Sequence, residues 1–323
     1  MDKAMKRLFL FSSFDPGNRI SEPLLNYLRH LAEFGDIVFV ADNDLAAGDI
    51  AKIAPLTLYR AHGPHGEYDW GSYKRGFQWA HDARVLADYD RVYMLNDSMF
   101  FVTPPNKTAR GVMSELFATL ETADAGSVFL LKTWANNKFI NKTLLGKTLW
   151  HSHMQSWFIG VSGAVAQSGW FNEFITGVTR QKKKKNIITE YEVGFSFLCR
   201  RHGLKIASFL SDFKNRPFRE PLWLIQHGAP FIKKRALGQT DSRTNISEFK
   251  KLGAPETGMI LDEIKRQIGD AEFAKLSARD KPYVYRRFGP VSVRRHYTPE
   301  NKYVSDWYLF RWRIARLAAR MTK

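Results

Sequence analysis

The block of residues 68–77 is the sequence's first candidate for binding a phosphate-bearing ligand. It reads YDWGSYKRGF, and its glycine and serine predict a turn that opens a helix over 72–87. The backbone N–H groups and the positive dipole end of a helix start attract anions, and two cations follow in the first turns. The residues of this block that we assign to a donor site are Asp69, Gly71, Ser72, Lys74 and Arg75. The alternative is an ordinary surface helix whose two cations are solvated.

A second polar group, Asn96-Asp97-Ser98, directly follows an apolar stretch that predicts a strand. A carboxylate at the carboxyl end of a buried strand does little for stability and is well placed to meet a ligand or its metal ion. Oxygen ligands suit Mg²⁺ or Mn²⁺, so Asp97 is a candidate metal ligand, and all three residues are candidates for donor binding. Because the group holds only one carboxylate, a simple Asn-Asp-Ser turn is the alternative.

Glu190 and Glu192, in the stretch ITEYEVGF, are candidate general bases. The pattern predicts a helix that begins at Thr189 or Glu190, runs to Arg201 and is ended by Gly203. A carboxylate that takes the proton from a reacting hydroxyl typically contributes a factor of about 10²–10⁴ in rate. Acidic residues in a first helical turn are also common for a simpler reason, since they stabilise the helix dipole.

Three residues of the stretch HMQSWFIGV, namely Gln155, Ser156 and Trp157, are candidates for contacting an acceptor or a donor sugar. The stretch predicts a strand, and the tryptophan would either stack on a sugar ring or lie buried in the core. His151 and His153 alternate as strand residues would, but no third ligand follows at a spacing typical of a metal site.

The elements that must position these groups alternate between strand and helix. Predicted strands cover 6–14, 36–42, 54–60, 90–97 and 127–133, and predicted helices begin near 21 and cover 72–87 and 110–121. Continuous apolar runs indicate a mostly parallel sheet covered by helices on both faces, which is an α/β fold of Rossmann type. Such sheets bind ligands outside the carboxyl ends of their strands, where the candidate residues follow.

The composition is that of a folded and strongly basic protein. Of 323 residues, 44% are hydrophobic, and the formal net charge is +17. The single cysteine, Cys199, excludes an internal disulfide framework and a cysteine-based zinc site. No apolar run approaches the ~18–20 residues of a spanning helix, and the first residues do not resemble a secretory signal, so we expect a cytoplasmic protein.

Positive charge is concentrated near the end of the chain. Residues 281–323 hold eleven Lys and Arg residues against two acidic ones, a net charge of +9. We place a soft boundary between a domain over 1–238 and a helical, basic extension over 239–323. Residues 303–323 predict an amphipathic helix whose apolar stripe is flanked by arginines, which fits the surface of an anionic membrane. The alternative is a terminal helix packed on the protein's own core.

Taken in order, five motifs resemble the rhamnan synthesis protein F family of bacterial polysaccharide glycosyltransferases. They are YDWGSYKRG, LNDS, HMQSWFIGVSG, ITEYEVGFSFLCRRHG and PLWLIQHGAPFIKK, within residues 5–238. The resemblance implies a GT-A-like nucleotide-sugar fold. The chain is also similar to the wider group of inverting GT-A enzymes. In that comparison Asn96-Asp97-Ser98 falls at the metal-binding Asp-x-Asp position, and Glu192, eleven residues before Gly203, falls at the position of the base.

The resemblance also implies an activity and its partners. It implies an inverting hexosyltransferase that moves rhamnose, galactose or another hexose from a nucleotide-diphosphate sugar. The acceptor would be a lipid-linked or free oligosaccharide, such as a glycan carried on polyprenyl diphosphate. The setting would be the synthesis of cell-surface polysaccharide, such as the O-antigen of lipopolysaccharide, with the enzyme peripheral at the inner face of the plasma membrane.

The sequence departs from the pattern of these enzymes at the metal motif, at the acidic pair and in the loop RAHGPHGEYDWG. Asn96 and Ser98 replace the outer carboxylates of the metal motif. Either Asp97 binds a divalent ion without them, or no ion is needed and Lys74 and Arg75 counter the phosphate charge. The acidic pair is separated by a tyrosine, so both glutamates stay candidates for the base.

Two other classes of function stay open on the sequence. A catalytically silent scaffold that binds a nucleotide sugar would account for the altered metal motif. A basic nucleic-acid-binding protein would account for the charge. However, the chain has no RRM, KH, zinc-finger or helix-turn-helix pattern, and its basic residues gather at one end. We therefore expect no nucleic-acid partner.

Overall fold

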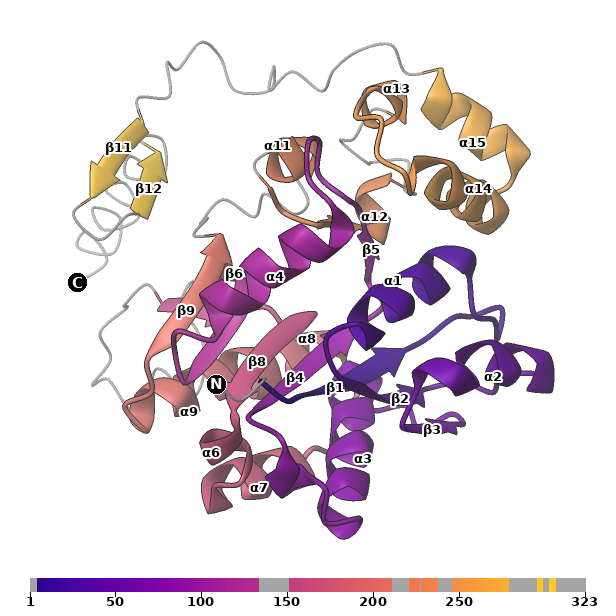
Figure 1. Cartoon of the computed structure of the whole chain (residues 1–323). Helices are drawn as coiled ribbons and strands as arrows, with labels where there is room; N and C mark the ends of the chain where they lie inside the picture. Colours follow the sequence, from indigo (N-terminus) through magenta and orange to yellow (C-terminus); the bar gives the residue numbers. More distant parts are fainter. Residues whose placement is uncertain are drawn as a thin grey trace, which may run out of the picture.

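The computed structural model describes residues 5–133, 151–210, 221–226, 228–237, 246–278, 295–298 and 302–305. Within these residues the chain forms an eight-stranded sheet flanked by helices, together with two small two-stranded sheets (Figure 1). The predicted α/β class, with a mostly parallel sheet covered by helices, is confirmed.

The first half of the main sheet is parallel. Its strands are β1 (Arg7–Ser13), β2 (Asp36–Ala41), β3 (Tyr59–His62) and β4 (Arg91–Asn96), in the order β3-β2-β1-β4. β1 lies between β2 and β4, and every residue of β1 after the first is buried, because helices cover both faces. The carboxyl ends of these strands therefore share one edge of the sheet.

The second half of the sheet is mixed. β8 (Phe158–Ser162) pairs antiparallel with β4 and with β6 (Ala125–Thr133). β6 also pairs antiparallel with β7 (His151–Met154) and parallel with β9 (Ile206–Leu210). Gly160 of β8 lies opposite Tyr93 of β4, and a Cβ atom at Gly160 would lie 2.4 Å from the Tyr93 ring. The close approach of the two strands thus requires glycine at this position.

Alternate residues of β1 point to opposite faces and into separate cores. Phe9 and Phe11 lie in a core shared with α1 (Glu22–Ala32), α2 (Ala47–Ile53) and α4 (Ala109–Leu120). Leu8 and Leu10 lie in a core shared with α3 (Tyr68–Asp82), α6 (Gly163–Ala166), α7 (Gly169–Thr176) and α9 (Gly194–Arg201). The sheet is thus the middle of three layers, as predicted for continuous apolar strands.

The start of α1 agrees with the sequence, whereas the start of β3 does not. The Ser21 hydroxyl accepts a hydrogen bond from the backbone N–H of Leu24 (3.4 Å), which caps α1 at the predicted start. The strand predicted over 54–60 is wrong in its first half. Ala54–Leu56 form a 3₁₀ turn (η1) with a proline in it, and β3 begins only at Tyr59. Proline lacks the N–H that a strand ladder needs. A second 3₁₀ turn, η2 (Leu86–Asp88), leads into β4.

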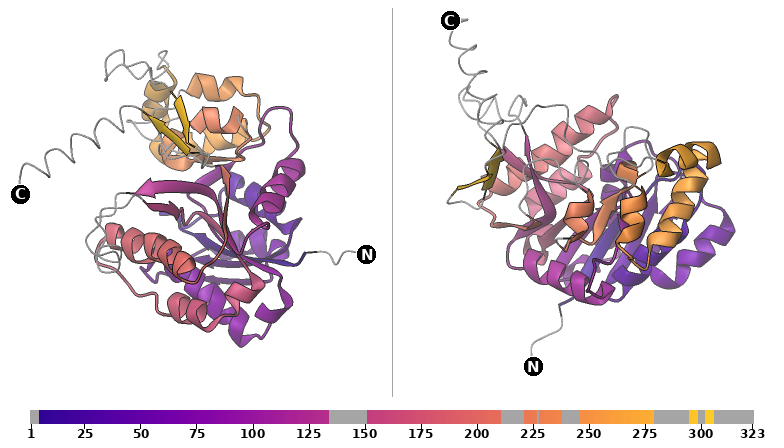
Figure 2. Two further views of the ribbon diagram at one scale, coloured as in Figure 1. Left: turned by 90° about the vertical axis from the view of Figure 1, so that its left-hand side faces the viewer. Right: turned by 90° about the horizontal axis from the view of Figure 1, so that it is seen from above.

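A further group of elements forms around β5 (Met99–Phe101), which pairs antiparallel with β10 (Phe231–Lys233). Its helices are α11 (Pro221–Gln226), α12 (Lys234–Leu237), α13 (Ile246–Lys251), α14 (Thr257–Ile268) and α15 (Asp270–Ser277). Figures 1 and 2 show α13–α15 at the opposite end of the molecule from α6 and α7. The predicted boundary at 238 stays a prediction.

The same group has a third core, which joins residues from both sides of position 238. It includes Phe100 of β5, Ile232 of β10 and Phe249 of α13. A buried carboxylate adds a polar link, because Glu256 accepts hydrogen bonds from the backbone N–H (2.9 Å) and the hydroxyl (2.6 Å) of Thr103.

The end of the chain differs from its predicted structure. β11 (Arg295–Thr298) and β12 (Lys302–Ser305) form an antiparallel pair, so the first residues of the helix predicted over 303–323 are strand. Tyrosine and valine at 303 and 304 favour a strand. Residues 306–323, with the arginines and the apolar stripe, lie outside the described residues. Among the helices that the structure describes, none has the length and apolarity to cross a bilayer.

Candidate active site

Helix α3 begins earlier than the sequence predicts, at Tyr68 and not at Ser72. The loop before it is fixed by Asp42, which follows β2. The Asp42 carboxylate accepts hydrogen bonds from the backbone N–H groups of His65 (2.6 Å) and Gly66 (2.7 Å). After this loop the helix begins at Tyr68, so Gly71 and Ser72, which were predicted to form a turn, lie within its first turns.

Gly71 and Ser72 therefore do not present a helix start to a phosphate group. The Gly71 N–H donates to the carbonyl of Glu67 (3.2 Å), and a Cβ atom at Gly71 would lie 2.2 Å from the Glu67 Cβ, so packing requires glycine here. Ser72 is buried, and its hydroxyl lies 3.0 Å from His65 Nε2. Burial lowers the pKa of His65, so this imidazole is held in its neutral form. Both residues support the start of α3.

The two cations of α3 bind Glu67. Lys74 Nζ lies 2.9 Å from Glu67 Oε2 and donates to the carbonyl of Val178 (2.7 Å). Arg75 Nη1 lies 2.5 Å from the same carboxylate oxygen and donates to the carbonyl of Gly71 (3.0 Å). Burial acts to raise the pKa of Glu67, but the hydrogen bonds from Arg75 and Lys74 outweigh it and lower that pKa. Both predicted phosphate-binding cations are thus engaged by one glutamate.

Four elements bring Asp69, Asn96, Ser156 and Glu192 together, and we call these residues the acid cluster. Asn96, the last residue of β4, donates from Nδ2 to Asp69 Oδ2 (3.1 Å). The Ser156 backbone N–H (3.1 Å) and hydroxyl (2.7 Å) both reach Glu192 Oε2. The same hydroxyl lies 2.9 Å from Asp69 Oδ2. The acid cluster lies at the carboxyl edge of the sheet, where α/β folds bind ligands.

The two carboxyl groups of the acid cluster differ in acidity and share one hydroxyl. The Ser156 hydroxyl has one proton, so it can donate to only one of the two carboxyl oxygens beside it. The one hydroxyl proton therefore serves two acceptor oxygens, at 2.7 Å on Glu192 and 2.9 Å on Asp69. Burial raises the pKa of Asp69; the hydrogen bond from Ser156 lowers it, and the charge of Glu192 raises it further. Of the two carboxyl groups, Asp69 is therefore the weaker acid.

Glu192 is the anionic partner of the pair. Burial acts to raise the pKa of Glu192, but the hydrogen bond and charge of His153 and the hydrogen bonds of Ser156 outweigh it and lower that pKa. His153 Nε2 donates to Glu192 Oε1 (2.9 Å). The His153 side chain is buried, and its Nδ1 has no hydrogen-bond partner in the described part of the chain. The Glu192 side chain keeps 13% of its surface exposed.

The helix that carries Glu192 begins earlier than predicted. α8 (Lys184–Ile187) continues into a π-helical turn, η3 (Ile188–Val193), and then into α9. Such π turns are rare and are frequent at functional sites. Ser196 anchors the turn, because its hydroxyl accepts from the Met154 N–H (2.8 Å) and donates to the Glu192 carbonyl (3.1 Å). Glu190 lies two residues earlier in the same π turn.

Gln155, Ser156 and Trp157 lie in a turn between β7 and β8, where the sequence predicts one continuous strand. The Trp157 ring is buried, and its Nε1 donates to Gln155 Oε1 (2.8 Å). Phe129 and Phe231 pack against the ring. This placement favours the core interpretation of Trp157 over stacking on a sugar. Ser156 is the member of the three that meets the acid cluster.

Asn96-Asp97-Ser98 forms the turn between β4 and β5. Asn96 Oδ1 accepts from the N–H (3.0 Å) and the hydroxyl (2.6 Å) of Ser98, as in an Asx turn. Asp97 Oδ2 accepts from the Ser13 hydroxyl (3.1 Å) and the Phe14 N–H (3.2 Å), and lies 3.5 Å from the ammonium group of Lys234. All three side chains thus have partners within the protein.

This set of groups is a poor fit for a divalent ion. Asn96 Oδ1 is occupied by Ser98, and an ion at Asp97 would have to displace or sit beside an ammonium group. Among the described residues, no group of three His, Cys, Asp or Glu side chains is placed to hold a metal ion. Of the two alternatives that the sequence leaves open at Asp97, this donor set favours the one without a divalent ion.

Lys233 and Lys234 also lie near this site, although neither was predicted from the sequence. They are the last two residues of the motif PLWLIQHGAPFIKK. The β5–β10 pair brings them to the acid cluster, and the Lys234 N–H donates to the Ser98 carbonyl (3.1 Å). Burial lowers the pKa of Lys233 to about 8, against the charges of Glu192 and Asp69, which raise it. The signal that could have identified them is a pair of lysines at the end of an apolar strand.

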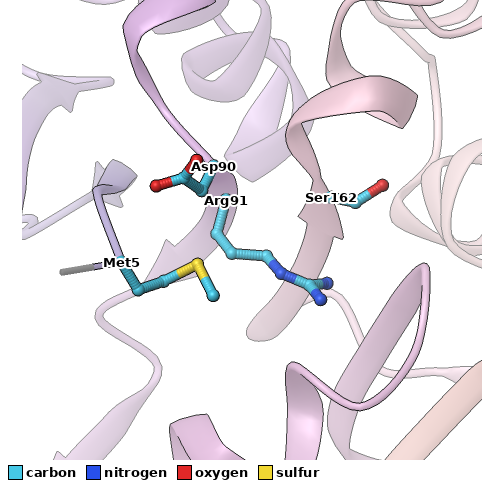
Figure 3. Close-up of a pocket in the computed structure, with 4 residues that line it drawn as sticks. All are labelled: Met5, Asp90, Arg91 and Ser162. Carbon is cyan, nitrogen blue, oxygen red and sulfur yellow. The ribbon is translucent and has the colours of Figure 1, made fainter. Parts of the chain in front are cut away.

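A cavity of about 240 Å³ lies at the other end of β4. Met5, Asp90, Arg91 and Ser162 line it (Figure 3). Arg91 begins β4, whereas Asn96 ends it, so this cavity and the acid cluster lie at opposite edges of the sheet. It takes no part in the site described here.

Several solved structures are similar to this chain at low identity. A Desulfovibrio desulfuricans G20 protein assigned as a nucleotide-diphospho-sugar transferase is 14% identical, covers 82% of this chain and 98% of its own, and has a TM-score of 0.37. The mannosyltransferase Ktr4p of S. cerevisiae, solved with GDP, is 12% identical over 54% of this chain and 60% of its own, with a TM-score of 0.34. Core-mannan synthase A of Aspergillus fumigatus, in an Mn/GDP form, is 10% identical over 61% and 70%, with a TM-score of 0.34.

No curated protein matches the sequence. The family model described as rhamnan synthesis protein F matches residues 37–266, which include every member of the acid cluster and both lysines of β10 and α12. The match covers most of the chain, from β2 to α14, and continues past the predicted boundary at 238. The chain therefore belongs to the rhamnan synthesis protein F family.

Proposed function

We propose that the chain is a glycosyltransferase that moves a sugar from a nucleotide-diphosphate donor to a hydroxyl group of an acceptor. Family membership supports this class of reaction. The observation that carries the proposal is the acid cluster, in which two carboxyl groups of different acidity share one hydroxyl at the ligand-binding edge of the sheet.

The reaction needs a group that accepts a proton from the acceptor hydroxyl. In our proposal Glu192 is that base, because it is anionic, partly exposed and held in position by His153 and Ser156. As the acceptor oxygen bonds to the anomeric carbon of the sugar, its proton passes to Glu192. The bond from that carbon to the diphosphate oxygen breaks, and the diphosphate leaves with the bonding electrons. Direct displacement of this kind inverts the configuration at the anomeric carbon.

The donor would bind beside the acid cluster, at the turn that follows β4. Asn96, Asp97 and Ser98 are the candidates from this turn, and Asp69 is the candidate from α3. We further propose a hexose such as rhamnose or galactose as the transferred sugar, and a lipid-linked or free oligosaccharide of cell-surface polysaccharide synthesis as the acceptor. Family membership supports both choices.

A membrane-bound acceptor would suit the basic end of the chain. We propose that residues 303–323 hold the enzyme at an anionic membrane surface, where each cation near the surface contributes roughly 1 kcal/mol. Sedimentation with anionic vesicles tests this: the full chain should sediment, and a chain that ends at 302 should stay in solution. Equal sedimentation of both would contradict the proposal.

Turnover of purified protein tests the proposed reaction. A panel of nucleotide sugars is first screened for a rise in the unfolding temperature, because selective binding stabilises the folded protein. Release of nucleoside diphosphate is then measured with an oligosaccharide acceptor for the wild type, Glu192→Gln and the matched control Glu190→Gln. We expect transfer that is lost in the first variant and kept in the second. Binding without transfer in the wild type would instead indicate a silent scaffold.

A further inference from the structure

The departing diphosphate needs positive charge, and the cations that the sequence offers for it are already engaged. Lys74 and Arg75 each form an ion pair with Glu67, at 2.9 Å and 2.5 Å. Both also donate to backbone carbonyls, those of Val178 and Gly71. A donor that recruited either cation would have to break these contacts and leave Glu67 unpaired.

Two other cations are fixed directly beside the acid cluster. Lys233 is the last residue of β10, and Lys234 is held by the hydrogen bond from its N–H to the Ser98 carbonyl. The Lys234 ammonium lies 3.5 Å from Asp97 Oδ2, with only 21% of its side-chain surface exposed. It therefore places a positive charge at the carboxylate that is the candidate ligand for a divalent ion.

Lys233 directly precedes Lys234, where β10 ends beside the turn that follows β4. The charges of Glu192 and Asp69 raise the pKa of its ammonium group, whereas those of Lys184 and Arg235 lower it. These residues lie on η3, α3, α8 and α12, so charged groups from four elements act on Lys233. Neighbouring cations disfavour the charge of a half-buried lysine, whereas an anionic ligand would stabilise the charge of each of these cations.

We propose that the donor diphosphate binds between Lys233 and Lys234 without a divalent ion, and that Asp97 is a positioning residue for the Lys234 ammonium. This inference rests on the proposed function, since it names the groups that bind the leaving group in that reaction. The two ammonium groups supply the charge that a metal ion would otherwise supply. They stabilise negative charge on the diphosphate oxygens as the bond to the sugar breaks.

Binding of nucleoside diphosphates by calorimetry tests the inference without relying on turnover. UDP, GDP and dTDP are titrated into the full chain in excess chelator, and again with Mn²⁺ present. We expect binding of the preferred nucleotide in chelator. Lys233→Ala and Lys234→Ala should each weaken it by about 10- to 100-fold, the loss of one charge-assisted contact. Lys275→Ala, at a lysine whose side chain is 73% exposed on α15, is the matched control and should bind as the wild type does.

Two additions separate a lost contact from a damaged fold. Lys234→Arg keeps the charge and should recover most of the affinity, and thermal unfolding of every variant shows whether it is folded. The electron paramagnetic resonance signal of free Mn²⁺, measured without nucleotide, should stay unchanged when the protein is added, because the protein does not bind the ion. In Asp97→Asn the affinity should fall, because Lys234 loses its positioning partner.

Three results would overturn the inference. The first is nucleotide binding that disappears in chelator and returns with Mn²⁺. The second is capture of Mn²⁺ by the wild type but not by Asp97→Asn. The third is a greater loss of affinity in Lys74→Ala than in either Lys233→Ala or Lys234→Ala. A chain that binds none of the nucleotides in either condition would instead refute the proposed function itself.

Discussion

Replacing Ser156 by alanine removes the one hydroxyl that contacts both carboxyl groups of the acid cluster. Glu192 would keep the backbone N–H of residue 156 and His153, and Asp69 would keep Asn96. Because one proton serves the two contacts, we count one lost hydrogen bond to a charged group, which contributes about 1.5–3 kcal/mol. The free energy of unfolding at pH 7 should fall by about that amount, since the site is buried and the variant differs by one atom.

The pH dependence of this loss follows from the two carboxyl groups. The folded-state pKa of Glu192 is lowered, so its stabilising contribution is present above the ordinary value of 4.5 and is lost as the pH falls through the folded value. The raised pKa of Asp69 costs stability at neutral pH, and removal of Ser156 increases that cost. Both effects make the Ser156→Ala loss largest at pH 7 and smaller below about pH 4.5.

Urea unfolding followed by circular dichroism at pH 7 and pH 4 measures this difference. Ser168→Ala is the matched control, because the Ser168 hydroxyl donates to the neutral carbonyl of Val165 (2.6 Å). Its loss of stability should be the same at both values of pH. If Ser156→Ala lost as much stability at pH 4 as at pH 7, the hydroxyl would not act on the carboxyl groups, and the acid cluster as described would be refuted.

Three further predictions concern rate, affinity and packing. Glu192→Gln should lower turnover by about 10²–10⁴-fold while Glu190→Gln changes it little, and the reverse order would identify the other base. Nucleotide affinity should fall as the pH rises through about 8, where Lys233 loses its charge. Lys233→Arg should abolish this dependence, and an unchanged dependence in that variant would assign it to another group. Gly160→Ala should lower the free energy of unfolding by about 1–3 kcal/mol, because its Cβ would meet the Tyr93 ring at 2.4 Å. Denaturant unfolding measures this loss, and unchanged stability would contradict the close approach of the two strands.

The parts of the fold that the sequence predicts are those governed by local pattern. The apolar runs of β1, β2 and β4 give the parallel sheet and its ligand-binding edge. Glu192 and Ser156 are also found from local sequence, because their motifs stand out within a few residues. What local pattern cannot give is the partner of each group, and here the two meet across the turn between β7 and β8.

The parts that the sequence does not predict depend on contacts distant in the chain. Glu67 lies only seven residues before Lys74, yet nothing in that spacing shows that it binds both cations of α3. Lys234 meets Asp97 across 137 positions, through the pairing of β10 with β5. A short strand of three residues gives too weak a local signal to predict that pairing.

The buried link between Glu256 and Thr103 has a consequence for any attempt to trim this protein. A version that stops at residue 238 would retain every side chain proposed to bind donor or acceptor. It would nevertheless uncover Phe100 and Ile232 and leave the Thr103 amide without its carboxylate. The short strand β10, which ends at Lys233, would then be exposed to solvent on the face that α13–α15 cover. A shortened version of the protein that is meant to fold should therefore extend at least to the end of α15.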